Sequence, residues 1–300
     1  MMLTRIKRKL DRAWFNFRCA GIYNTPPIKC DTSSHVVIVS QLHHPDMTMY
    51  MLAAKSFAQY VKPRGFVIVD DGLNAADKHI LSTHFECIQF IPRSERGSDV
   101  CPSGSCWERF LTLAHENQSH YVIQLDSDTL TLAEPVEVLQ SIATGRSFTL
   151  GTSSGTHFVA LPEASRHAHA DPDPHVQNHA ERALGQYPHA TQLKYVRGCA
   201  GFTGFAPGKL SIPAIEAFSL QMQALVGRQK WHEWGSEQVA SNFMAANVDD
   251  SLVLPVDRYP FWEPGLDIGR AVLIHFFGTF RFMGGMYIRQ SLRIIQRLRT

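Results

Sequence analysis

Short runs of apolar residues alternate with amphipathic stretches over the first 130 positions of the chain. The runs are rich in Val and Ile, as is typical of buried strands. They occupy residues 35–41, 65–73, 86–92 and 121–128. Between them, apolar positions recur every three or four residues, which predicts helices at 49–61, 75–85 and 106–118. This alternation predicts an α/β fold with a mostly parallel, doubly wound central sheet.

The alternation ends after Leu132. Residues 151–195 are rich in Gly, Ser, His, Pro and Asp, and this composition predicts a long solvated excursion over the ligand-binding face of the sheet. The excursion holds four histidines whose irregular spacing favours loop residues over metal ligands. These are His167, His169, His175 and His179.

Secondary structure resumes after the excursion. Residues 193–208 predict a strand with glycine kinks, and residues 233–247 predict a helix with Ser236 as its N-cap. Residues 271–282 predict a last strand, which ends at His275. The chain shows no internal repeat, so we expect one α/β domain with decorated ends.

Both ends carry basic amphipathic segments, at residues 1–33 and 283–300. Their apolar residues recur at helical spacing among arginines and lysines: Ile6, Leu10, Trp14 and Phe17 in the first, and Ile288, Leu292, Ile295 and Leu298 in the second. Helices of this kind can lie on anionic membrane surfaces. The alternative is that both helices pack on the central domain, residues 34–282, with their arginines in solvent.

Composition bears on location and partners. The formal net charge of +2 is too small to indicate a nucleic-acid-binding protein. No stretch approaches the roughly 20 apolar residues that span a bilayer, and the basic start lacks the apolar core of a signal peptide. Six cysteines without a framework spacing predict free thiols. We therefore expect a cytoplasmic protein, peripheral at the inner face of the cytoplasmic membrane if the basic ends bind lipid.

Two carboxylates one residue apart, Asp126 and Asp128, follow an apolar strand. On an extended strand they would point the same way about 7 Å apart, whereas a turn would fold them around one small volume. Such oxygen ligands suit Mg²⁺ or Mn²⁺ with room left for phosphate oxygens. The alternative is an ordinary turn, where Asp and Ser are common. The position at the carboxyl end of a strand, where such sheets bind ligands, gives the two interpretations equal weight.

Two later residues strengthen the metal interpretation. His275 lies in a strand-like run, and an imidazole with two carboxylates is a coherent ligand set for Mn²⁺, although a core histidine is the alternative. Glu237 lies at the start of a predicted helix, where a carboxylate is electrostatically favoured. Taken alone, Glu237 predicts no more than a helix-capping acid.

Taken in order, these features resemble the nucleotide-sugar glycosyltransferases of GT-A fold. The resemblance covers about residues 34–282: "VDDGL" at an early strand end, "DSD", a glycine-containing "GCAGFTGF", Glu237 in "GSEQ", and His275. It implies a Rossmann-like α/β/α sandwich with a nucleotide-binding half, residues 34–132, and an acceptor-side half, residues 133–282. It also implies a hexosyltransferase that moves sugar from a nucleoside diphosphate, UDP being favoured, to a glycan or lipid-linked acceptor.

The resemblance also implies roles for single residues. Asp126, Asp128 and His275 would hold Mn²⁺ or Mg²⁺, with Asp128 as the direct ligand. The donor would contact Ser40, Gln41, Asp70, Asp71, Asp126, Gly201 and Gly278, with Lys55 or Arg109 assisting the diphosphate. Glu237 would be the general base if the reaction inverts the anomeric centre, and would orient the acceptor if it retains it.

The chain also departs from the family pattern. Gln238 stands where many members have a second acid, and "HFFGTFRF" lacks the lysine, proline and tryptophan of the glycogenin-like "HF-G-K-P-W" pattern. Two alternatives therefore stay open: a transferase-like domain that binds nucleotide or glycan without turnover, and a sugar-nucleotide pyrophosphorylase. Against the second, the first strand exits into "SQLHHPDM" without the glycine-rich, basic signature of that class.

Overall fold

A seven-stranded sheet forms the centre of the protein in a computed structural model that describes residues 2–300, with side chains from residue 6 onwards. Its strand order is β10-β6-β9-β4-β1-β2-β3. The strands are β1 (Val36–Leu42), β2 (Gly65–Asp70), β3 (Ile88–Pro92), β4 (Tyr121–Leu125), β6 (Phe148–Leu150), β9 (Cys199–Phe205) and β10 (Leu252–Leu254). Only β9 pairs antiparallel with its neighbours in this sheet, β4 and β6. The predicted mostly parallel sheet is confirmed.

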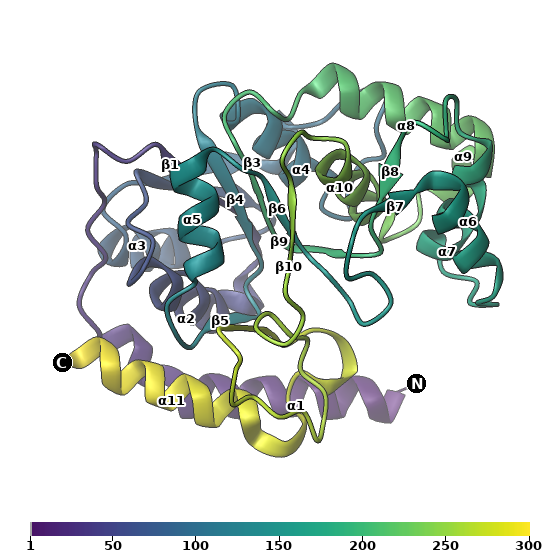
Figure 1. The fold of residues 1–300 in the computed structure, drawn as a ribbon. Coiled ribbons are helices and arrows are strands. Elements are labelled where there is room, and N and C mark those ends of the chain that lie inside the picture. Colours follow the sequence, from purple (N-terminus) through teal and green to yellow (C-terminus); the bar gives the residue numbers. More distant parts are fainter. Residues whose placement is uncertain (1) are drawn as a thin grey trace.

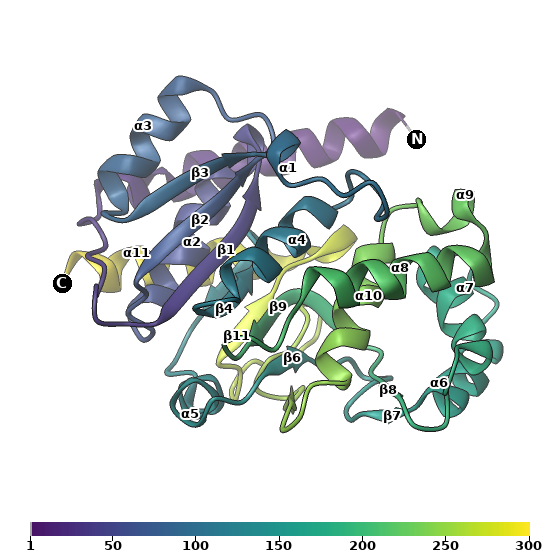
Figure 2. The ribbon, with the colours of Figure 1, turned by 90° about the horizontal axis from the view of Figure 1, so that it is seen from above.

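Helices cover both faces of the sheet, because alternate strand residues point to opposite sides. Ile38 of β1 packs in one core, whereas Val37 and Val39 pack in the other. The first core includes α2 (Met47–Ala58), α3 (Ala75–His84) and α5 (Val136–Thr144); the second includes α4 (Trp107–Glu116), α8 (Ile212–Val226) and α10 (Ser236–Ala246). The result is a three-layer α/β/α sandwich (Figure 2).

The excursion is more ordered than the sequence predicts. It contains α6 (Leu161–His169), α7 (Val176–Ala183) and a short antiparallel pair, β7 (Val159–Ala160) with β8 (Lys194–Tyr195). The expectation of a solvated loop was wrong here, because Leu161, Val176 and the alanines between the polar residues are buried against the body of the domain. Three of the four histidines lie on these helices, and His175 precedes α7 as its N-cap.

The N-cap predicted for α10 is also wrong. Gly235 caps this helix with φ 106°, a conformation that favours glycine, and Ser236 is its first residue. The Ser236 hydroxyl instead accepts a hydrogen bond of 2.9 Å from Trp107 Nε1. Shorter elements complete the chain: β5 (Thr129–Thr131), β11 (Leu273–His275), α9 (Arg228–Trp231), and 3₁₀ turns at 20–24, 44–46, 93–95, 184–186, 278–280 and 283–285.

The two basic ends are helical, as the sequence predicts. α1 (Met2–Cys19) and α11 (Met286–Arg299) lie side by side beneath the sheet domain (Figure 1). α11 buries Tyr287, Ile294 and Ile295 against the domain, whereas α1 leaves much of its apolar surface exposed. Among the described residues, no helix is long and apolar enough to cross a bilayer.

Candidate active site

The "DSD" segment is a turn that leaves the central sheet. β4 ends at Leu125, and both the amide and the hydroxyl of Thr129 donate to the carbonyl of Asp126, at 3.3 and 2.9 Å. β5 follows and pairs with β11, in a register that places His275 opposite Thr129. The chain therefore turns around one small volume, and a strand distant in sequence brings the imidazole to it.

Three side chains meet at this turn. One ligand atom from each of Asp126, Asp128 and His275 lies within 4.8 Å of the others. His275 Nε2 is 3.0 Å from Asp128 Oδ1 and 3.7 Å from Asp126 Oδ2. A Cβ at Gly201 would lie 2.3 Å from His275 Cε1 and 2.9 Å from Asp126 Oδ2, so glycine keeps this space open. The donor set and the open space fit a divalent cation such as Mn²⁺ or Mg²⁺.

Two arginines balance the carboxylates. Buried Arg109, from α4, pairs with Asp126 and lies 3.3 Å from Glu237 Oε1. Arg281 donates to Asp128 Oδ2 at 2.5 Å. The sequence named Arg109 as one of two diphosphate candidates but missed Arg281. Arg281 could have been found from the sequence, because it lies six residues after His275, in the segment that we compared with the "HF-G-K-P-W" pattern.

These contacts shift several pKa values. Burial raises the pKa of Glu237 to about 7, although Arg109 opposes the rise. Burial also favours a higher pKa for Asp128, but His275 and Arg281 outweigh it and hold the value at about 2. Burial tends to lower the pKa of His275, yet the Asp128 carboxylate holds it well above its usual range. A cation bound at His275 would therefore displace a proton.

One cavity of about 420 Å³ is lined both by the predicted metal ligands and by Glu237, the predicted catalytic residue. Its wall includes all three ligands, both arginines, Glu237, Gln238, Gly201 and Gly278. This volume lies within the usual range of small-molecule sites, roughly 300–1,000 Å³. Residues from β9, α10 and the segment after β11 thus meet at the carboxyl end of β4.

The residues expected to hold the nucleoside lie at the neighbouring strand ends, outside the wall of this cavity. The amide of Gln41 donates to Asp71 Oδ2 at 3.0 Å, and Asp70 pairs with Lys78 at 2.6 Å. The Ser40 hydroxyl is buried and donates to the carbonyl of Leu125 at 2.7 Å, which ties β1 to β4. The structure brings these four residues together at the carboxyl ends of β1 and β2.

Lys55 does not lie at the site, contrary to one of the two diphosphate alternatives. Lys55 belongs to α2, and its side chain is buried against the segment that holds Thr25 and Pro26. The ammonium donates to Thr25 Oγ1 at 2.9 Å and to the carbonyl of Pro26 at 2.6 Å. Burial lowers the pKa of Lys55 to about 8. The helical period turns this residue inward, so Arg109 is the diphosphate candidate that remains.

Comparisons with known proteins identify the type of fold. No protein family and no curated protein matches the sequence. Among solved structures, WbbM, a bifunctional glycosyltransferase, matches with a TM-score of 0.55 and 12% identity, over 90% of this chain and 51% of its own. An active-site mutant of LgtC matches with a TM-score of 0.52 and 10% identity, over 88% of this chain and 96% of its own. The chain thus spans about half the length of WbbM, and its fold is the predicted GT-A fold.

Proposed function

We propose that the protein is a metal-dependent glycosyltransferase that uses a nucleoside-diphosphate sugar. The observation that carries this proposal is the meeting of Asp126, Asp128 and His275 at the carboxyl end of β4 in a GT-A fold. The same cavity holds two arginines and a buried glutamate. This combination supplies a cation site, counter-charges for phosphate and a proton acceptor in one place.

The chain's own residues bind and orient the donor. Arg109 and Arg281 place two positive charges beside the ligand carboxylates, where they offset the charge of a departing diphosphate. Bound Mn²⁺ or Mg²⁺ would add Lewis-acid neutralisation of that diphosphate. Gly201 and Gly278 line the cavity without side chains and so admit the donor close to the backbone.

The nucleoside occupies the adjoining sheet edge in this proposal, within the half formed by residues 34–132. The Gln41–Asp71 pair and Asp70 offer donors and acceptors for base and ribose, with the backbone at Ser40 beside them. A UDP-sugar is the donor we favour. The acceptor, a glycan or a lipid-linked saccharide, approaches from the half formed by residues 133–282.

Glu237 acts on the acceptor hydroxyl. Its carboxylate is buried in the cavity wall at the first turn of α10, and its pKa of about 7 suits a general base near neutral pH. In an inverting reaction Glu237 takes the hydroxyl proton, whereas in a retaining reaction it orients the acceptor. A buried carboxyl group with such a raised pKa is typical of catalytic sites, so Glu237 favours an enzyme over a domain that only binds nucleotide.

The test is thermal denaturation with UDP, GDP, CDP and their sugars, with Mn²⁺ and with a chelator. A ligand at 100 times its dissociation constant adds about 2.7 kcal/mol, which raises the melting temperature by several degrees. We expect a Mn²⁺-dependent rise with one nucleotide. Gly201→Ala should abolish it, because the new methyl group occupies the space between His275 and Asp126.

The matched control is Gly97→Ala. Gly97 is exposed, and a Cβ there meets no heavy atom within 4 Å, so the nucleotide response should equal that of the wild type. An unchanged response in Gly201→Ala would place the cation elsewhere. Absence of any response to nucleotide and metal in the wild type would contradict the proposed function.

We also propose that α1 rests on an anionic membrane surface, while α11 packs on the domain. Ile6, Leu10, Trp14 and Phe17 are exposed, the last by 72%. At about 100° per residue they fall within about 80° of the helix circumference. Lys9 flanks this apolar stripe on one side, and Lys7 and Arg18 flank it on the other. Such charges each add about 1 kcal/mol of attraction to anionic lipid. The cytoplasmic location stays a prediction.

Leu10→Glu combined with Phe17→Glu should lower binding to phosphatidylglycerol-containing vesicles by at least about tenfold, since each buried apolar side chain is worth roughly 1.5–3 kcal/mol. Sedimentation with vesicles measures the effect. The control is Leu220→Glu on α8, another exposed leucine on a different helix. Equal binding of the double variant and the wild type would exclude α1 as the contact.

A further inference from the structure

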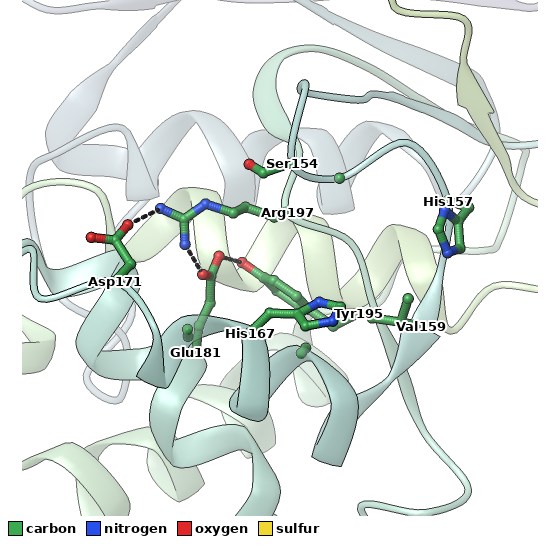
Figure 3. A pocket seen from close by; sticks show the side chains of 11 residues that line it. Ser154, His157, Val159, His167, Asp171, Glu181, Tyr195 and Arg197 are labelled. Carbon is green, nitrogen blue, oxygen red and sulfur yellow. Dashed lines mark hydrogen bonds and ion pairs between the residues drawn. The ribbon is translucent and has the colours of Figure 1, made fainter.

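A second cavity, of about 290 Å³, lies within the excursion (Figure 3). Its wall is formed by α6, α7, the β7–β8 pair and the turn before β7. Val159, Ala164 and Ala168 supply an apolar side, and Ser154, His157, His167, Asp171 and Arg197 supply polar groups. Apolar walls with a few placed polar groups are typical of small-molecule sites. Its small volume suits a single ring better than a nucleotide.

The charges of this cavity are balanced within the wall. Arg197 reaches between Asp171 and Glu181, as the close-up shows, and pairs with both. Glu181 is buried and also accepts a hydrogen bond of 2.9 Å from the hydroxyl of Tyr195. Two carboxylates already face the guanidinium, and the group of metal ligands found among the described residues lies in the catalytic cavity and not here, so an anionic ligand gains little. Arg197 and Asp171 stay 30% and 46% exposed, so a neutral ligand with several hydroxyl groups can approach them as donor and acceptor.

The cavity is built by close backbone contacts. A Cβ at Gly155 would lie 2.3 Å from the carbonyl oxygen of Arg197, so only glycine allows the turn to approach. The hydroxyl of Thr152 donates to that same oxygen at 2.5 Å. These contacts hold Arg197 in place before any ligand arrives, which lowers the entropic cost of binding.

The second cavity adjoins the catalytic one. Gln238, in the wall of the catalytic cavity, donates to Gln177 Oε1 at 2.8 Å, and Gln177 donates to Glu181 Oε1 at 2.9 Å. Along the chain, Arg197 is two residues from Cys199 of the catalytic cavity. Two residues span at most about 7 Å. The walls of the two cavities therefore share one hydrogen-bonded network, and a saccharide of two or more rings is the class of acceptor long enough to contact both.

We propose that this cavity binds a neutral sugar ring of the acceptor, beyond the ring that receives the transferred sugar. The inference rests on the proposed function, since it names the acceptor as an oligosaccharide held in two places. It gives the excursion a role in selecting the acceptor, and this role does not follow from the fold alone.

The experiment is an NMR titration of the full chain with cellobiose, maltose, lactose and a glucuronic-acid disaccharide, following the side-chain signals of His157 and His167. We expect saturable shifts with at least one neutral disaccharide. Val159→Phe fills the cavity and should weaken this binding at least about tenfold. The control, His179→Phe, adds the same ring at an exposed position of α7 outside the cavity and should bind as the wild type does.

Melting with UDP, GDP and CDP, each with Mn²⁺, is measured on the same samples, which separates the two proposals. A nucleotide response without binding of any disaccharide overturns the sugar subsite and leaves the proposed function intact. Disaccharide binding lost in Val159→Phe but without a nucleotide response supports a sugar site and contradicts the transferase. Equal binding in Val159→Phe and the wild type, or preference for the uronic acid, overturns the assignment to a neutral ring.

Discussion

Asp128→Asn is expected to lower sugar transfer by about 10²–10³-fold, the scale of losing one preorganised group that stabilises developing charge. The carboxylate lies 3.0 Å from His275 and 2.5 Å from Arg281, so its charge organises both the cation site and the phosphate-facing arginine. Asparagine keeps the shape but not the charge. Alanine would remove the side-chain oxygens as well as the charge, so that buried His275 and partly buried Arg281 would lose their hydrogen-bond acceptor too.

The measurements are turnover with Mn²⁺ and the Mn²⁺-dependent rise in melting temperature with nucleotide, both of which should be lost. Asp257→Asn is the control, because Asp257 is half-exposed and, among the described residues, pairs with the exposed Arg270 alone, at 2.8 Å. Near-normal turnover of Asp128→Asn would contradict the metal hypothesis. Loss of the nucleotide response in the Asp257 variant would show that general stability, not the site, governs the signal.

Glu237→Gln is expected to lower transfer by about 10²–10⁴-fold while nucleotide binding persists, because general bases contribute on this scale. Burial raises the pKa of Glu237 to about 7, so the carboxyl is protonated below that pH. A base must be ionised, and the wild-type kcat/KM should therefore fall as pH decreases through about 7. The residual activity of Glu237→Gln should lack this acidic limb.

The stereochemistry of the product distinguishes the two proposed roles of Glu237, which are general base and acceptor-orienting residue. In a retaining enzyme the loss in Glu237→Gln should appear mainly in the acceptor KM, since the residue then orients the acceptor. Glu263→Gln, at an exposed glutamate, is the control and should leave the pH profile unchanged. An acidic limb that persists in Glu237→Gln would assign that titration to another group.

The sequence was sufficient for the first half of the fold because its information there is local. Strand and helix periods differ, and β1, α2, β2, α3, β3, α4 and β4 each follow the period of their own residues. Carboxyl ends of parallel strands share one edge, so Asp126 and Asp128 could be placed at a ligand-binding edge. The resemblance of "DSD", Glu237 and His275, in that order, to the GT-A glycosyltransferases then implied which distant residues would meet there.

Other features depended on contacts between distant segments. The excursion looked solvated by composition, yet Leu161 and Val176 are buried, because packing against the domain gives short polar helices a partner that their sequence does not reveal. Lys55 was one of two diphosphate candidates but donates to the hydroxyl of Thr25 and the carbonyl of Pro26. The sequence did not indicate that Arg281 belongs to the site, because its contact with Asp128 depends on how the segment after β11 folds over the "DSD" turn.

The sequence by itself determined the α/β alternation, the acidic strand end, the late histidine and the two basic terminal helices, since periodicity and residue chemistry are properties of short segments. Only the tertiary structure decided that "DSD" turns instead of continuing a strand, that β11 carries His275 to it, and that α1 and not α11 exposes its apolar stripe. Those outcomes depend on which surfaces become buried against one another. Burial is a property of the whole chain, and no short segment encodes it alone.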